Sequence, residues 1–233
     1  MKSAKHDSPE RILEERACEI GLTIDGFINQ GKSIFATSSF QTHSIPLLHI
    51  LSRCQKKVPV YFANTGFLFP ETLQFQDQVS KQLNIEVREV GSNLPKIHQL
   101  NEDGNFLFTS DPDRCCFINK IEPVRRLMQS LDVWVNGVRR DQTETRKGMD
   151  RIQQGPDNCL RFHPMLDWSE AEIKLYSRMH QLPEHPLSEQ GYESIGCQPC
   201  TRMIGGRDGR WSGLRKTECG LHTVLAAKRT KAK

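Results

Sequence analysis

Short runs of β-branched and aromatic residues alternate with helical patterns along most of this chain, and this alternation constrains the fold more than any other feature. Strand-forming runs occupy residues 33–38, 58–63, 85–90, 133–136 and 160–165. Apolar residues at helical spacing predict one or two helices over 8–29, and further helices over 44–54, 71–82, 114–129 and 169–179. Because strands that alternate with helices pair in parallel, we expect an α/β fold with a parallel sheet.

Polar residues and glycines directly follow three of these predicted strands. Ligands of such sheets bind beyond the carboxyl ends of the strands. The candidates for ligand binding at this edge are Ser38, Ser39, Thr65, Gly66, Gly137 and Arg139. The loop after the first strand also leads into a helix, and helix N-termini bind phosphates.

The charge distribution favours a small anionic ligand. The 233 residues carry a formal net charge of +4, and basic residues gather at 139–146 and 202–216. A mild excess of positive charge, concentrated near glycines, suits a small anionic ligand better than a nucleic acid. No apolar run is long enough to cross a bilayer, and the N-terminal MKSAKHDSPE lacks the apolar core of a secretory signal. We therefore expect a cytoplasmic protein that binds neither membranes nor nucleic acid.

Four of the eight cysteines form two pairs far apart in the sequence. Cys115 and Cys116 are adjacent, whereas Cys197 and Cys200 form a Cys-x-x-Cys motif. Four thiolates can bind zinc or an iron–sulfur cluster. The side chains of adjacent cysteines diverge, so the two thiolates are poorly placed to bind the same tetrahedral ion. In a cluster, each thiolate can bind a separate iron. The spacing therefore favours a four-iron cluster, with zinc, a redox-active disulfide or unrelated buried cysteines as the alternatives.

Another cysteine, Cys219, lies among charged residues near the C-terminus. Lys216 and His222 are cations that favour the reactive thiolate, and Glu218 opposes them. Gly220 leaves one side of the thiol accessible. From these residues alone, Cys219 is either a nucleophile or an exposed thiol without a function.

Together these motifs resemble the assimilatory sulfonucleotide reductases, which reduce adenosine 5′-phosphosulfate (APS) or its 3′-phosphorylated form (PAPS). The matching segments, in the family's order, are Ser38-Ser39, NTGFLFPET (64–72), CCFINKIEP (115–123), VNGVRRDQTETR (135–146), GCQPCTR (196–202), RDGRW (207–211) and KTECGLH (216–222). The resemblance implies an adenine nucleotide alpha-hydrolase-like sheet, related to the ATP pyrophosphatases, with a C-terminal catalytic tail. It implies a nucleotide-binding α/β domain over 1–190 and a tail over 191–233 that completes the same domain.

The same resemblance implies a cofactor and a nucleophile. Family members with both cysteine pairs carry a 4Fe–4S cluster and are usually APS reductases. In this chain the cluster ligands would be Cys115, Cys116, Cys197 and Cys200. Cys219 matches the family's nucleophile, which forms a thiosulfonate intermediate before thioredoxin or glutaredoxin releases sulfite.

Several cations match family residues that handle the substrate. Lys120 matches a lysine between cluster and substrate, and Arg207 and Arg210 resemble tail arginines that contact the phosphosulfate. His222 belongs to the same tail motif as Cys219. One departure is Asn119, because the family often has arginine before the lysine.

The resemblance implies thioredoxin-dependent reduction of APS to sulfite and AMP, in sulfate assimilation and cysteine biosynthesis. A cluster-containing PAPS reductase is the main alternative, and a zinc-binding module without catalysis is another. An ATP pyrophosphatase that thiolates tRNA is more remote, because the loop over 38–44 lacks the glycines and the aspartate that hold pyrophosphate.

Overall fold

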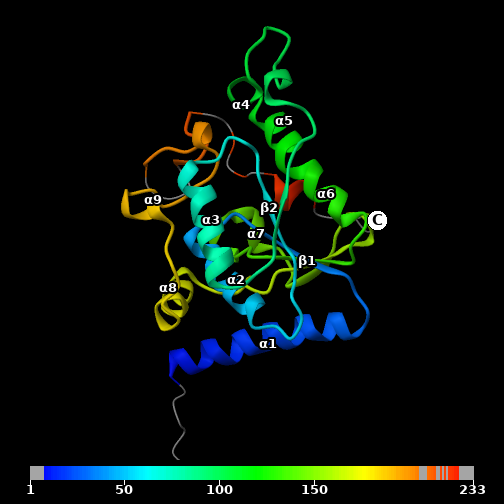
Figure 1. Ribbon diagram of the computed structural model, residues 1–233, viewed down its shortest axis with the longest axis vertical. Coiled ribbons are helices and arrows are strands. Elements are labelled where there is room, and N and C mark those ends of the chain that lie inside the picture. Colours follow the sequence, from blue (N-terminus) through cyan, green and yellow to red (C-terminus); the bar gives the residue numbers. More distant parts are fainter. Residues whose placement is uncertain (1–7, 205–208, 214–215, 217, 219, 226–233) are drawn as a thin grey trace, which may run out of the picture.

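A six-stranded sheet forms the centre of the molecule (Figure 1). The computed structural model describes residues 8–204, 209–213, 216, 218 and 220–225. Within them the strands lie in the order β3-β2-β1-β4-β6-β5. Their bounds are Ile34–Ser38 for β1, Val60–Ala63 for β2, Val87–Val90 for β3, Val133–Asn136 for β4, Ile152–Gln154 for β5 and Leu160–Phe162 for β6.

The strand prediction is largely confirmed. All five expected strands are present and run parallel to one another, although β2 and β3 begin at Val60 and Val87 and β6 ends at Phe162. The expected parallel sheet is confirmed, and a sixth strand that we did not predict, β5, pairs antiparallel with β6 at one edge. The sequence of β5 is Ile-Gln-Gln, and these mostly exposed residues carry no strand signal.

Alternate residues of the central strands point to opposite faces of the sheet, and helices cover both faces. Ala36 and Val135 pack into the larger core. The helices on that side are α1 (Pro9–Asn29), α2 (Ile45–Ser52), α3 (Pro70–Gln82) and α8 (Glu170–Met179). Phe35 and Trp134 pack on the other face against α6 (Glu122–Met128) and the start of α10 (Leu221–Val224). The sheet is therefore the middle layer of three, as expected for parallel strands buried on both sides.

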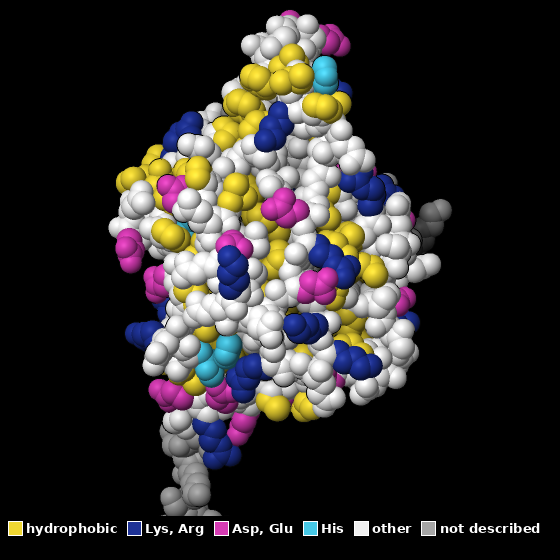
Figure 2. Space-filling model, in the orientation of Figure 1, with side chains coloured by type: hydrophobic (Ala, Val, Ile, Leu, Met, Phe, Trp, Pro, Cys, Tyr) yellow, Lys and Arg dark blue, Asp and Glu magenta, His cyan; other side chains and the backbone are white. Residues whose placement is uncertain are grey.

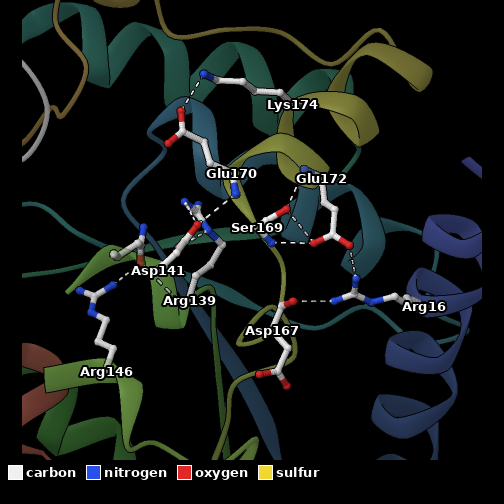
Figure 3. A network of polar contacts seen from close by, with 10 residues as sticks. Arg16, Arg139, Asp141, Arg146, Asp167, Ser169, Glu170, Glu172 and Lys174 are labelled. Carbon is white, nitrogen blue, oxygen red and sulfur yellow. Dashed lines mark hydrogen bonds and ion pairs between the residues drawn. The ribbon is translucent and has the colours of Figure 1, made fainter. Parts of the chain in front are cut away.

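Two of the covering helices begin at side-chain caps. The Ser8 hydroxyl accepts a hydrogen bond from the backbone N–H of Arg11 at the start of α1. At the start of α8, Ser169 and Glu172 form a reciprocal capping box. Glu172 also pairs with Arg16 of α1 at 2.5 Å, which joins the two helices (Figure 3).

The predicted helix over 114–129 is present but not uniform. It consists of α5 (Pro112–Cys116), a π-helical turn over Phe117–Ile121, and α6. The widened turn carries Asn119 and Lys120. Such π turns occur often at functional sites, because they re-aim side chains within a helix.

An arm projects from the body of the molecule between β3 and α5 (Figure 1). Hydrophobic side chains gather over this arm in Figure 2, and its exposed large apolar residues are Leu94, Ile97, Leu100 and Phe106. The remaining short helices are α4 (Leu107–Ser110), α7 (Glu144–Lys147) and α9 (Pro186–Glu189). In the described part of the chain, no helix combines the length and apolar character needed to cross a membrane.

Candidate active site and cysteine cavity

The carboxyl ends of β1, β2 and β4 lie side by side. Ser38 at the end of β1 lies opposite Phe62 of β2, and Thr37 lies opposite Asn136 of β4. The hydroxyl of Ser38 accepts a local hydrogen bond from a backbone N–H two residues further on, and Ser39 is exposed at the same edge. The structure therefore places the first predicted loop at the edge where ligands of such sheets bind.

Thr65 and Gly66 follow β2 and connect this edge to the cysteines. Thr65 is buried, and its Oγ1 lies 3.2 Å from Cys197 Sγ. Gly66 has a φ of 68°, a conformation that glycine adopts without strain. Its carbonyl accepts a hydrogen bond from Lys96 at 2.5 Å, and a Cβ on Gly66 would overlap the lysine side chain.

The two cysteine pairs meet at one cavity. It is lined by all four predicted cluster ligands, Cys115, Cys116, Cys197 and Cys200. The first pair ends α5, and the second lies in a 3₁₀ turn of the tail. This turn docks beside the loop after β2, because Gln198 donates its backbone N–H to the carbonyl of Phe67 at 2.7 Å.

The donor set of the cavity fits a four-iron cluster. No disulfide links the seven cysteines that the structure describes. Among the described residues, no group of three or more Cys, His, Asp or Glu side chains is arranged to hold a metal ion. The four cysteines nevertheless line one cavity, and four thiolates are the ligand set that a 4Fe–4S cluster requires.

Two predicted substrate residues, Lys120 and Arg210, line the same cavity. Arg210 is buried, lies 4.5 Å above the Trp211 ring and donates to the carbonyl of Ile195 at 3.3 Å. Lys120 projects from the π turn one helical turn after Cys116. Both cations are therefore close to the cysteines, and not only to the strand ends.

These cations act unequally on the thiols. Burial opposes the thiolate of Cys197, but Lys120, the Thr65 hydroxyl and Arg210 together outweigh it and lower the Cys197 pKa. Burial raises the pKa of Cys115 to about 11, and burial followed by the neighbouring Cys197 raises that of Cys200. The positive charge of the cavity thus stabilises negative charge mainly on Cys197.

Gly137 and Arg139 follow β4, as the strand prediction requires. Arg139 is buried and pairs through Nε with Asp141 at 3.0 Å, while its Nη1 has no hydrogen-bond partner among the described residues. Asp141 also accepts from the backbone N–H of Glu170, which ties this segment to α8 (Figure 3). A buried guanidinium with an unused N–H is suited to an anionic ligand.

A buried ion pair that we did not predict lies next to Cys219 in the sequence. Arg146 Nη2 lies 2.9 Å from Glu218 Oε1, and both side chains are at least nine-tenths buried. The Thr143 hydroxyl donates to the same carboxylate at 3.1 Å. Arg146 lies in α7, so the pair holds the tail against a segment that follows β4. Its presence in the VNGVRRDQTETR motif was the available sequence signal.

A second anchor lies on the other side of Cys219. The ring of His222 stacks on Trp134, with centroids 5.5 Å apart, and its carbonyl accepts from Arg161 Nη2 at 3.2 Å. Arg161 is fully buried in β6, and burial lowers its pKa to about 10. Its sequence signal is a charged residue within an apolar strand. Arg207 and Cys219 themselves lie outside the described residues.

Comparison with solved structures gives the fold class. A phosphoadenylyl-sulfate (PAPS) reductase from Candida auris, in a phosphate complex, matches with a TM-score of 0.64 at 19% identity, covering 85% of this chain and 97% of that one. An FMN adenylyltransferase from Candida glabrata, in complex with FMN and an ATP analogue, matches with a TM-score of 0.61 at 16% identity, covering 88% and 70%. The architecture is the adenine nucleotide alpha-hydrolase-like fold, as the resemblance implied.

Sequence comparison gives the family. Residues 33–203 match the phosphoadenosine phosphosulfate reductase domain. A protein from Chelativorans sp. (strain BNC1), named adenosine 5′-phosphosulfate reductase, is 38% identical over 228 residues, which cover 93% of this chain and 86% of the relative. A Gloeobacter violaceus protein named phosphoadenosine 5′-phosphosulfate reductase is 36% identical over 202 residues, covering 82% and 83%. The chain belongs to the phosphoadenosine phosphosulfate reductase family.

Proposed function

We propose that this protein is an oxidoreductase that reduces APS to sulfite and AMP with electrons from thioredoxin or glutaredoxin, in sulfate assimilation and cysteine biosynthesis. The observation that supports this most strongly is the cavity shared by the two cysteine pairs beside the strand ends. The names of the relatives support the reaction type, and more of those compared are named for APS than for PAPS.

In this proposal the 4Fe–4S cluster would be held by Cys115, Cys116, Cys197 and Cys200. When bound, it supplies a fixed charge distribution beside the substrate, while the electrons come from thiols. Lys120 lines the cysteine cavity, and in this proposal it lies between the cluster and the substrate sulfate. The oxygens of phosphate and sulfate accept hydrogen bonds from forked guanidinium donors, which suits Arg139, Arg207 and Arg210.

The reaction at Cys219 divides into two displacements. The Cys219 thiolate attacks the sulfate sulfur of APS, the sulfur–oxygen bond to AMP breaks, and a thiosulfonate remains on Cys219. A thioredoxin thiolate then attacks Cys219 Sγ and sulfite leaves. The second thioredoxin thiol resolves the mixed disulfide, so that one dithiol supplies both electrons. Because two anions meet in the first step, fixed positive charge lowers its barrier.

The remaining strand-end residues would contact the nucleotide. These are Ser38, Ser39, Thr65, Gly66 and Gly137, with His222 from the tail. We further propose that 1–190 form the nucleotide-binding α/β domain and that 191–233 complete it, as the docking of the tail turn at Phe67 suggests. A reduced state of the described cysteines is usual in the cytoplasm, where we place the protein.

Turnover of APS and PAPS by the anaerobically purified protein, with thioredoxin as donor, tests this proposal. We expect a brown protein that releases sulfite faster from APS, and a Cys219→Ser variant that releases none. Cys18→Ser, at an exposed position, is the matched control and should retain full turnover. Faster turnover of PAPS would favour the alternative substrate, and no turnover of either would refute the proposed reaction.

Mass spectrometry after addition of APS alone tests the intermediate. A sulfite-sized adduct should form on the peptide that contains Cys219 and disappear on addition of thioredoxin. Sulfite release without such an adduct would contradict the covalent route.

A further inference from the structure

Asn119 occupies the position at which this chain departs from its family's charge pattern. The missing arginine removes a cation, and the structure shows a buried amide in its place. Asn119 lies in the π turn between α5 and α6, with only 2% of its surface exposed. Its side chain lines the cysteine cavity. A buried amide requires partners for its donors and acceptor, and these partners define its orientation.

Gln99 is the first of these partners. Gln99 Nε2 donates to Asn119 Oδ1 at 3.0 Å, and Asn119 Nδ2 donates to Gln99 Oε1 at 2.7 Å. Gln99 is equally buried, and its Nε2 also donates to the carbonyl of Leu94 at 2.9 Å. Since a carbonyl only accepts, this contact determines which end of the Gln99 amide is nitrogen. The reciprocal pair then determines the orientation of Asn119.

The resulting orientation directs an N–H group at a predicted cluster ligand. One hydrogen of Asn119 Nδ2 goes to Gln99 Oε1, and the second is shared between the Cys115 carbonyl at 3.0 Å and Cys115 Sγ at 3.6 Å. A flipped amide would present oxygen lone pairs to the sulfur and repel negative charge on it. The amide pair therefore favours electron density on Cys115 in one orientation only.

Asn119 also borders two cavities. Asn119 and Thr65 line both the cysteine cavity and a neighbouring, more open cavity of about 280 Å³, which Gln99 lines as well. An apolar pair of similar size could form the same wall between the two cavities. Only a correctly oriented amide can also donate a hydrogen bond to sulfur. The two roles can therefore be distinguished by experiment.

We propose that Gln99 orients Asn119 so that its amide N–H donates to the Cys115 sulfur and stabilises the added negative charge of a reduced cluster in this cavity. Asn119 touches the ligand sulfur, and Gln99 is a positioning residue that acts through it. The inference rests on the proposed 4Fe–4S cofactor. Hydrogen bonds to ligand sulfurs are among the features that determine the reduction potential of such clusters. The potential serves here as a probe of the sulfur's surroundings, and catalysis needs no electron from the cluster.

Redox titration of the anaerobically purified full chain, followed by visible absorption and electron paramagnetic resonance, tests the inference. We expect Asn119→Leu to lower the equilibrium constant for cluster reduction by about tenfold, a potential about 59 mV more negative for one electron. Gln99→Leu should shift the potential in the same direction. In the Asn119→Leu background, Gln99→Leu should add no further shift, because Gln99 acts through Asn119. Gln129→Leu, an exposed amide at the end of α6, is the matched control and should leave the potential unchanged.

The double variant Gln99→Leu/Asn119→Leu guards against misfolding, because it leaves no buried amide without its partner. It should show the Asn119→Leu potential even if the single variants fold poorly. An unchanged potential in the double variant, with the cluster intact, would overturn this inference and leave the proposed function standing. Faster iron loss in air at an unchanged potential would show that the Gln99–Asn119 pair only shields the cavity. That result would also overturn the inference. Wild-type protein that contains no iron would refute the proposed cofactor and this inference together.

Discussion

His163 is a fully buried histidine beside the strand ends, and its surroundings keep it neutral. Its Nδ1 lies 2.6 Å from Asn136 Oδ1. Burial, followed by the nearby charges of Arg161 and Arg146, lowers the pKa of His163 from 6.5 to about 3. The folded protein therefore excludes a proton that the unfolded chain binds.

This exclusion predicts a specific loss of stability in acid. Stability due to neutral His163 is complete above pH 6.5 and is lost as the pH falls towards 3, because only the unfolded chain gains the proton in that range. Between pH 7 and pH 5 the wild type should lose about 2 kcal/mol more than His163→Gln. Urea unfolding at both pH values measures this difference. Equal losses in the two proteins would show that His163 is protonated in the folded state.

Single residues also show where sequence reasoning reached its limit. Cys115 and Cys197 could be grouped from their spacing, because both belong to recognisable pairs. Arg161 could have been suspected, since a charge inside an apolar strand is unusual. Gln99 gave no signal, because its partner lies twenty positions away and its environment is created only by packing.

At the scale of elements, contacts on both sides of Cys219 hold the tail against α7, β4 and β6. Glu218 pairs with Arg146 before it, and His222 contacts Trp134 and Arg161 after it. The sequence motif indicated that these residues belong together, but not which arginine each would meet. The register of β4 with β6 places Trp134 beside Arg161, and these two residues are the partners of His222.

The Arg146–Glu218 pair predicts how the tail responds to mutation. Glu218→Ala leaves a buried guanidinium without its counter-charge, which costs about 3–5 kcal/mol. We expect faster protease cleavage of the tail and lower turnover. Arg146→Met/Glu218→Met should recover much of the protease resistance, because it removes both charges.

Limited proteolysis with mass spectrometry measures this effect. Glu144→Ala, which disrupts only the exposed pair with Lys147, is the matched control and should cleave like the wild type. A tail that is equally resistant in Glu218→Ala would show that the ion pair does not anchor it.

At the scale of the whole molecule, the cysteine cavity connects the middle of the chain to its C-terminal tail. Cys115 and Cys116 come from α5, and Cys197 and Cys200 from the tail turn that docks beside β2. A group bound to all four cysteines would cross-link α5 and the tail turn, which are far apart in the sequence. Ligand binding to the folded state alone adds to stability.

Iron removal should therefore destabilise the protein. Each kcal/mol lost lowers the Tm by about 2–4 °C in a protein of this size. Calorimetry of the anaerobic protein with and without a chelator measures the shift, and the region around 190–204 should become more sensitive to protease. A Cys115→Ser variant should already have the lower Tm and respond little to the chelator. Identical Tm values for iron-loaded and iron-free wild type would refute a structural contribution of the cofactor.

The sequence by itself determined the α/β architecture, its five parallel strands and the family, because strand runs, helical spacing and the cysteine motifs are local patterns. Only the tertiary structure decided that β5 pairs antiparallel at the edge, that a π turn interrupts the helix after Cys116, and that Arg146, Arg161 and the Gln99–Asn119 pair meet their partners. Buried polar contacts join residues that are distant in the chain. Their partners are chosen by strand register and helix packing, which no single segment specifies.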